Sequence, residues 1–260
     1  MRNIHQYEQA YLQDEHDFER YQVRYRRKKV LELYEKLPSN RVLEIGCGME
    51  PLFHFVPQDS FSQWVVVEPA DAFYAAAERA SKEDDRIHCL HRFFDEEAAL
   101  LKECCVHSGG AFDLIVCTGL LHEVEQPLAI LNGIRQLCSS ETRVLLNVPN
   151  ANSLHRLLGL RSGYIADTHV MTERNQAYQQ HRVFDCASFA ALLGQAGFAV
   201  DEMGSFFVKP FTHQQMEACL EHHIIDENVL DGLYRLSEDL PEVGSELYAV
   251  CHQSRCEQGK

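Results

Sequence analysis

The stretch Arg41-Val42-Leu43-Glu44-Ile45-Gly46-Cys47-Gly48 decides the fold, because two closely spaced glycines break a short apolar run. The apolar run predicts a buried β-strand. Glycine permits positive φ and a close approach between the backbone and a ligand. The apolar residues that follow, from Met49 to Val56, predict a helix. Strand, glycine turn and helix together form the arrangement that holds a nucleotide-like ligand at the carboxyl end of a parallel sheet.

A second apolar run, from Gln63 to Val67, predicts the neighbouring strand. It ends on Glu68, which lies 20 residues beyond Gly48 (68 − 48). An acidic side chain at about this distance can accept hydrogen bonds from both hydroxyls of a ribose. The nicotinamide fingerprint needs a third glycine at position 51, where this chain has Pro51. An NAD-dependent reductase, which would share the sheet topology, is therefore disfavoured.

The composition narrows the class of protein and of partner. The chain has 260 residues, enough for one large α/β domain, and its formal net charge is −15 (24 − 39). A field of that sign repels phosphate backbones, so we expect a small-molecule substrate and no nucleic acid. No apolar run approaches the ~18 residues that a membrane span needs. The sequence leaves the oligomeric state open.

The ten cysteines and the polar amino-terminal stretch bear on the compartment. The cysteines are scattered, several of them in apolar runs, which is typical of buried thiols in a reducing compartment. No signal peptide is visible between Met1 and Tyr21, so we expect a cytoplasmic protein. We expect no metal site, because Cys104, Cys105 and His107 lack the usual zinc spacing.

The pattern divides the chain into an amino-terminal segment and one α/β domain. Residues 4–36 predict a helix, so we assign 1–37 to a helical segment and 38–260 to the domain. The aromatic face of the amino-terminal segment either docks this segment on the core or forms part of a lid over the substrate. The basic cluster from Arg24 to Lys29 is either a solvated helix face or a contact with an anionic substrate.

Strands and helices then alternate, with one interruption. The further expected strands are 87–94, 112–117, 143–148, 199–208 and 246–252, and the expected helices are 70–80, 96–105, 127–137, 184–197 and 212–240. Residues 151–182 break the alternation with a long, polar stretch that contains His155, His169 and His181. A long loop inside a compact domain is usually functional, so we expect a cap insertion.

Several motifs resemble those of class I S-adenosylmethionine (SAM) methyltransferases, over residues 38 to 255. Glu44-x-Gly46-x-Gly48 resembles their motif I, although Glu50 stands where many members carry a further glycine. Phe112-Asp113-Leu114-Ile115 with Leu121-His122-x-Val124-x-x-Pro127 resembles motif II, and Val144 to Asn150 resembles the next strand. His181-Arg182-x-Phe184, before a helix ending Ala196-Gly197-Phe198, is similar to O-methyltransferases of the ubiquinone pathway.

The resemblance implies a fold and a cofactor site. The fold is an α/β, Rossmann-like, seven-stranded sheet with its last strand pair antiparallel and helices on both faces. The implied SAM contacts are Glu44, Gly46, Cys47, Gly48, Glu68, Pro69, Phe94, Asp95, Thr118, Gly119 and Leu120. The methionine carboxylate would lie near the amino terminus of the helix after the glycines. Two alternatives stay open: Glu44 caps the turn, or Asp95 caps the following helix.

The resemblance also implies methyl transfer to a small metabolite. A hydroxyl acceptor needs a base, and histidine suits that role near neutral pH. His122 is the first candidate because it follows the fourth strand, and His181 is the second, ahead of His155 and His169. His181 has the alternative role of pinning the insertion to the sheet. We expect O-methylation; N- or carboxyl-methylation, or SAM binding without transfer, are the alternatives.

Overall fold

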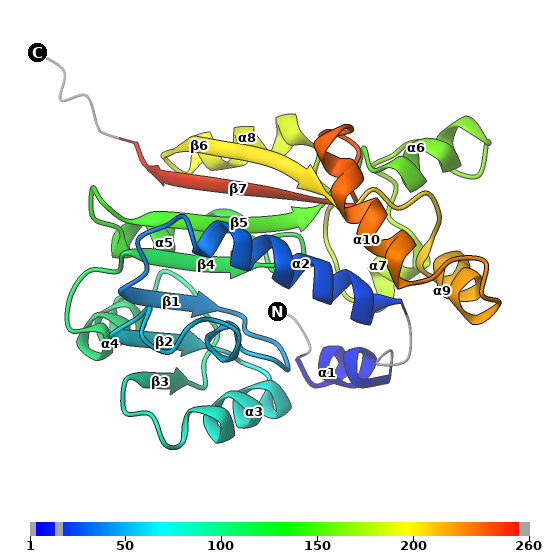
Figure 1. The fold of residues 1–260 in the computed structure, drawn as a ribbon. Helices are drawn as coiled ribbons and strands as arrows, with labels where there is room; N and C mark the ends of the chain where they lie inside the picture. Colours follow the sequence, from blue (N-terminus) through cyan, green and yellow to red (C-terminus); the bar gives the residue numbers. More distant parts are fainter. Residues whose placement is uncertain (1–3, 14–17, 255–260) are drawn as a thin grey trace, which may run out of the picture.

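The computed structural model describes residues 4–13 and 18–254, and these form one mixed sheet with helices on both faces (Figure 1). The seven strands lie in the order β3-β2-β1-β4-β5-β7-β6. Their bounds are β1 (Arg41–Ile45), β2 (Gln63–Val67), β3 (Ile87–Leu90), β4 (Leu114–Thr118), β5 (Arg143–Pro149), β6 (Phe198–Phe206) and β7 (Glu246–Gln253). The first five pair in parallel, and β7 pairs antiparallel with both β5 and β6. This confirms the sheet expected from the sequence.

The helices cover the two faces of the sheet unequally. Their bounds are α1 (Ile4–Gln13), α2 (Glu19–Tyr34), α3 (Asp71–Ser81), α4 (Ala98–Ser108), α5 (Pro127–Leu137), α6 (Leu154–Arg161), α7 (Glu173–Ala177), α8 (Cys186–Gln195), α9 (His213–Glu221) and α10 (Glu227–Arg235). Buried residues of α4, α5 and α8 pack against one face, and those of α2 and α3 pack against the other. Because helices cover both faces of the sheet, nearly every residue of β1, β2 and β4 is buried.

The amino-terminal segment docks on the carboxyl-terminal elements through an aromatic cluster. Phe18 and Tyr25 are buried, and Tyr25 stacks on Phe207 at 4.4 Å and on Tyr234 at 5.3 Å between ring centroids. The single helix expected over 4–36 is two helices, on either side of residues 14–17, which lie outside the described residues. The docking alternative thus accounts for these aromatic side chains, and the closing role stays a proposal.

The prediction of a helix after the glycine loop was wrong. That stretch holds only η2 (Leu52–His54), one turn of 3-10 helix. Pro51 precedes this turn and Pro57 follows it, so a longer helix would lose backbone donors. A three-residue turn carries no useful dipole, and the expected place for the methionine carboxylate at a helix amino terminus is therefore missing.

Several other boundaries also differ from the expectation, and two of them have clear local reasons. Strand β3 ends at Leu90 instead of 94, because its partner β2 ends at Val67, which pairs with Leu90. The expected helix over 212–240 divides into α9, α10 and η3 (Leu236–Glu238) where His223 adopts a φ of 54°. The insertion 151–182 is not a structureless loop, because it contains α6 and α7. Within residues 4–13 and 18–254, no helix has the length and apolar character to cross a bilayer.

Candidate active site

A large cavity opens at the carboxyl ends of the parallel strands. It has a volume of about 1680 Å³ and is lined by the loops after β1, β2 and β4, by α2, by the insertion and by residues 209–215. Figure 1 shows α1, α6, α7 and α9 gathered beyond this edge of the sheet. Ligand pockets usually measure roughly 300–1,000 Å³, so this cavity has room for a cofactor together with a second molecule.

The glycine loop forms one wall of the cavity. Gly46 and Gly48 have φ angles of 75° and 62°, in the left-handed region that favours glycine. The Gly46 amide donates to the carbonyl of Val67 at 2.9 Å, which ties the loop to the end of β2. A Cβ on Gly48 would meet nothing within 4 Å, so its conformation, and not crowding, requires glycine there.

Glu44 lies buried beneath this loop and lines the cavity. Its carboxylate accepts from the Leu52 amide at 2.9 Å and from the Trp64 indole at 3.1 Å. Burial, with the nearby charge of Glu68, raises the pKa of Glu44 to about 7 despite these hydrogen bonds. Glu44 therefore holds the turn in the way that the capping alternative expected, and its contact with the cofactor stays a prediction.

Glu68 holds the other side of the loop. Its carboxylate is buried, accepts from the Ala70 amide at 2.9 Å and lies 3.3 Å from the Gly48 amide. It lines the cavity together with Pro69 and the loop residue Cys47. Backbone donors thus hold this carboxylate at the end of β2, and its contact with a ribose stays a prediction.

Phe94 and Asp95 close the next part of the wall. Asp95 Oδ1 accepts from the Glu97 amide at 2.8 Å, just before α4, so it stabilises the entry to that helix. The N-cap position itself is Glu97. Gly133 of α5 packs directly beneath, since a Cβ there would lie 2.6 Å from the Asp95 carbonyl oxygen. Nothing in the local sequence pointed to this contact.

The floor of the cavity is the end of β4, at Thr118, Gly119 and Leu120. Gly119 has a φ of 69°, and a Cβ there would lie 3.5 Å from the Arg26 guanidinium. Arg26 of α2 donates to both carboxylate oxygens of the buried Glu246, at 2.8 and 2.7 Å. Arg26 is thus not part of a solvated helix face, which was one of the two roles that the sequence left open for the basic cluster.

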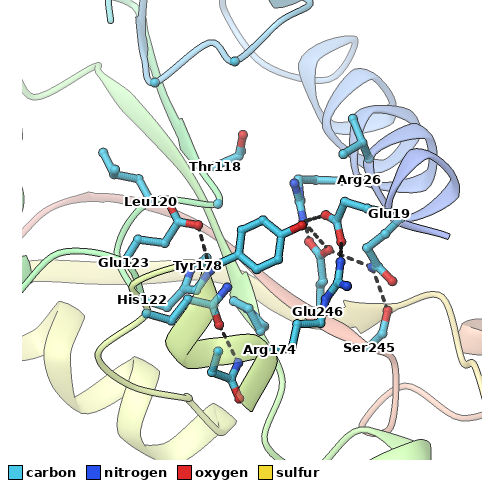
Figure 2. A pocket seen from close by; sticks show the side chains of 18 of the residues that line it. Glu19, Arg26, Thr118, Leu120, His122, Glu123, Arg174, Tyr178, Ser245 and Glu246 are labelled. Atoms are coloured by element: carbon cyan, nitrogen blue, oxygen red, sulfur yellow. Dashed lines mark hydrogen bonds and ion pairs between the residues drawn. The ribbon is translucent and has the colours of Figure 1, made fainter. Parts of the chain in front are cut away.

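His122 and Glu123 lie side by side just beyond this floor (Figure 2). Only 3% of the His122 surface is exposed, and its Nε2 lies 3.7 Å from Glu123 Oε1. His181, the second candidate, is an exposed residue of the cavity lining, and its backbone amide donates to the His122 carbonyl at 2.9 Å. The backbone of His181 therefore pins the insertion to the sheet. Figure 2 shows the ring of Tyr178, from the insertion, in the middle of the cavity with its hydroxyl directed toward Arg26 and Glu19.

Of the two remaining histidine candidates, only one lies at the cavity. His155 lines the cavity, and burial with the charge of Lys209 holds its pKa well below the usual range. His169 lies outside the cavity lining and contacts Asp167 at 3.3 Å and Asp185 at 3.5 Å. A group of polar residues that sequence reasoning missed also lines the cavity: Glu19, Arg174, Lys209 and His213. They come from three separate parts of the chain, namely α2, α7 and residues 209–213, so no local pattern links all of them.

Comparison with known proteins identifies the family. A family model described as a methyltransferase domain matches residues 15–203. The chain belongs to this methyltransferase family. It is a class I, SAM-dependent methyltransferase, and its cofactor is SAM. No curated protein has a sequence that matches the methyltransferase.

Solved structures with the same fold have distant sequences. The magnesium protoporphyrin IX methyltransferase ChlM from Synechocystis PCC 6803, with bound SAH, is 13% identical (TM-score 0.54; 88% of this chain, 84% of that one). The plantazolicin methyltransferase BpumL in complex with SAH is 16% identical (TM-score 0.54; 92% and 88%). The N-methyltransferase NodS from Bradyrhizobium japonicum WM9 is 13% identical (TM-score 0.51; 89% and 87%). At these identities the likeness shows the fold.

The residues of the methyltransferase fit SAM. The open space above Gly48 leaves its backbone accessible, and Glu68 and Asp95 place carboxylates along one side of the cavity. SAM carries a sulfonium and an ammonium, both positive, and a ribose with two donor hydroxyls. An acidic wall with an accessible backbone loop complements those groups.

Proposed function

We propose that this methyltransferase transfers the methyl group of SAM to a hydroxyl of a small molecule, with His122 as the base. The observation that carries the proposal is the place of His122. It is a buried imidazole at the carboxyl end of β4, it lines the cavity, and a carboxylate lies 3.7 Å from its Nε2. A base is of use to a hydroxyl acceptor, which must lose its proton as the new bond forms.

In this proposal, the cofactor end of the cavity does the orienting. Bound SAM supplies a methyl group that is already activated. Glu68 receives the ribose hydroxyls, Glu44 lies beside the methionine ammonium, and Asp95 and Phe94 meet the adenine. Cys47, Pro69 and the segment Thr118–Leu120 complete the cofactor wall. Holding two reactants in line is worth roughly 7–11 kcal/mol of the barrier, so these contacts carry most of the catalysis.

His122 takes the acceptor proton at the floor of the cavity. Glu123 stabilises the imidazolium that forms, because opposite charges close together in a buried place attract strongly. The Glu123 amide donates to the Leu120 carbonyl at 2.9 Å, and this turn fixes both side chains relative to β4. Proton uptake by a placed base contributes about 10²–10⁴-fold to such a reaction.

The segment 1–37 and the insertion 151–182 close over the acceptor in this proposal. Arg174 of the insertion lies 3.3 Å from Glu19 of α2, so an ion pair joins the two parts above the cavity. The Arg174 guanidinium also lies 5.0 Å from the centre of the Tyr178 ring (Figure 2). Closure would exclude water from the transfer step.

A pH–rate profile tests the base. With an acceptor found by screening metabolites against labelled SAM, we expect kcat to rise with pH along a limb near pH ~6–7, as a histidine base requires. The limb should vanish in His122→Ala and persist in His181→Ala. His169→Ala, outside the cavity lining, is the control. A limb that survives in His122→Ala removes this residue from the role of base.

One observation favours an amine as the second candidate acceptor. Glu123 is a buried carboxylate at the floor, and it would pair with an ammonium as readily as with an imidazolium. An amine needs only to be neutral and aligned at the moment of transfer. The two acceptors are told apart by the product, since an O-methyl and an N-methyl group differ in carbon chemical shift.

A further inference from the structure

A buried lysine lies in the cavity away from the cofactor wall. Lys209 follows β6, lines the cavity and has only 1% of its surface exposed. Lysine is almost never fully buried without a charge partner or a function. The transfer chemistry proposed above does not use it.

The backbone that leads to Lys209 is held in a costly conformation. Phe207 has a φ of 60°, which is rare for a bulky residue, and its side chain is buried between α2 and α10. The Phe207 carbonyl accepts from the Lys209 amide at 3.0 Å and from the Ser245 amide at 2.9 Å. Such strain costs roughly 1–3 kcal/mol and gathers at functional sites. The turn directs the next side chains, Lys209 among them, into the cavity.

Lys209, His213 and Glu19 lie in line. The Nζ of Lys209 lies 2.9 Å from His213 Nδ1, and His213 Nε2 lies 3.2 Å from Glu19. Burial and the charge of Lys209 lower the pKa of His213, whose ring lies between the lysine and the carboxylate of Glu19. Burial alone would raise the pKa of Glu19, but the His213 hydrogen bond and the charges of Arg26 and Arg174 hold it well below its usual range. The contact with His213 Nδ1 holds the Lys209 ammonium in place at this end of the cavity.

The rest of this end of the cavity suits a molecule with two unlike ends. Arg174 brings a second cation, held at Glu19. Apolar side chains lie nearer to the solvent: Phe211, two residues after Lys209, is 41% exposed, and Tyr164 is 85% exposed. Both line the cavity, as Leu158 does. Exposed aromatic side chains at the rim of a cavity are typical of a binding site for an apolar group.

We propose that Lys209 binds an oxyanion on the methyl acceptor, a carboxylate or a phosphate, while the apolar body of the acceptor lies against Phe211 and Tyr164. The inference rests on the proposed function, because it describes the acceptor of that same site. The simpler role for Lys209 is to pin the start of α9 through His213. The two roles differ in what they predict for ligand charge.

Three probes with one ring and different head groups test the proposal: benzoate, phenyl phosphate and benzamide. In the presence of SAH, we expect benzoate or phenyl phosphate to raise the melting temperature of the full chain, and the neutral benzamide to leave it unchanged. The anion that protects shows which head group the site takes. Lys209→Met should bind that anion about 10- to 150-fold more weakly, the range for one lost hydrogen bond to a charged group. Lys209→Arg should retain most of the binding.

Lys102→Met, which removes an exposed lysine on α4, is the matched control and should bind the anion normally. Affinity for SAH, measured by calorimetry, should be the same in both methionine variants as in the wild-type protein. A wild-type protein that does not bind SAH would instead contradict the proposed function. Equal protection by benzamide, no protection by either anion, or full anion binding by Lys209→Met would each overturn the proposal. If Lys209→Met does not fold, the comparison of the three probes on the wild-type protein decides.

Discussion

The contact between Gly133 and the carbonyl of Asp95 gives a sharp test of the adenine end of the site. Gly133 lies within α5, where alanine is normally favoured over glycine by about 1 kcal/mol. A Cβ at this position would lie 2.6 Å from the Asp95 carbonyl oxygen and 3.1 Å from the Phe94 ring. Real Cβ atoms do not approach backbone oxygen so closely, so Gly133→Ala must push the segment that carries Asp95 away from α5.

The size of the effect follows from two opposing contributions. Overpacking typically costs about 1–3 kcal/mol, and the helix preference returns about 1 kcal/mol. We therefore expect Gly133→Ala to lower the free energy of unfolding by about 0–2 kcal/mol. Gly232→Ala in α10 is the matched control, because a Cβ there meets nothing within 4 Å. That variant should gain up to about 1 kcal/mol.

Urea unfolding of the two variants, together with calorimetric titration of SAM, measures both quantities. Displacement of Asp95 should lower the affinity for SAM about tenfold, which corresponds to about 1.4 kcal/mol of binding free energy. Gly232→Ala should bind SAM as the wild type does. A Gly133→Ala protein that is as stable as Gly232→Ala and binds SAM normally would refute the reasoning about this contact.

Two further predictions concern the acidic residues of the cofactor wall. Glu68→Gln should weaken the binding of SAM by about 1.5–3 kcal/mol for each charge-assisted bond that is lost. The control is Asp71→Asn, which changes an exposed carboxylate three residues away and should leave the affinity unchanged. Equal affinities of the two variants in calorimetry would remove Glu68 from the site. Because the pKa of Glu44 is raised to about 7, this carboxyl holds a proton in the free protein at pH ~6, and a methionine ammonium beside it would expel that proton. Calorimetric titrations in buffers of different ionisation enthalpy should therefore show proton release on SAM binding at pH ~6 and none above pH ~8. Glu44→Gln should release no proton at either pH. Proton release that persists in this variant would leave Glu44 with its structural role alone.

The elements that sequence reasoning placed correctly are those specified by local patterns. Apolar runs gave β1 and β2, and the prediction for α5 was confirmed residue by residue, with Pro127 in its first turn. Gly46 and Gly48 adopt the positive φ that their motif requires. The resemblance then supplied the seven-stranded sheet with its last strand pair antiparallel, which no run of residues specifies by itself.

The errors arose where distant contacts decide the structure. The stretch after Gly48 has the composition of a helix, but its prolines and the Glu44 carboxylate on the Leu52 amide limit it to one turn. The relay of Lys209, His213 and Glu19 joins residues 209–213 to α2, and Gly133 contacts a residue of another loop. Such contacts leave no periodicity in the sequence, so only the folded structure reveals them.

The central claim is that the methyl group of SAM passes to a hydroxyl oxygen, and the fate of a labelled methyl group tests it most directly. The protein is incubated with SAM labelled with carbon-13 in the methyl group and with a pool of small hydroxylated acids, and the carbon spectrum of the products is recorded. We expect one methyl signal in the range of an ether, resistant to mild base and absent with His122→Ala. A signal in the N-methyl range, a product that mild base hydrolyses as an ester, or no transfer to any member of the pool by a protein that binds SAM would contradict the claim.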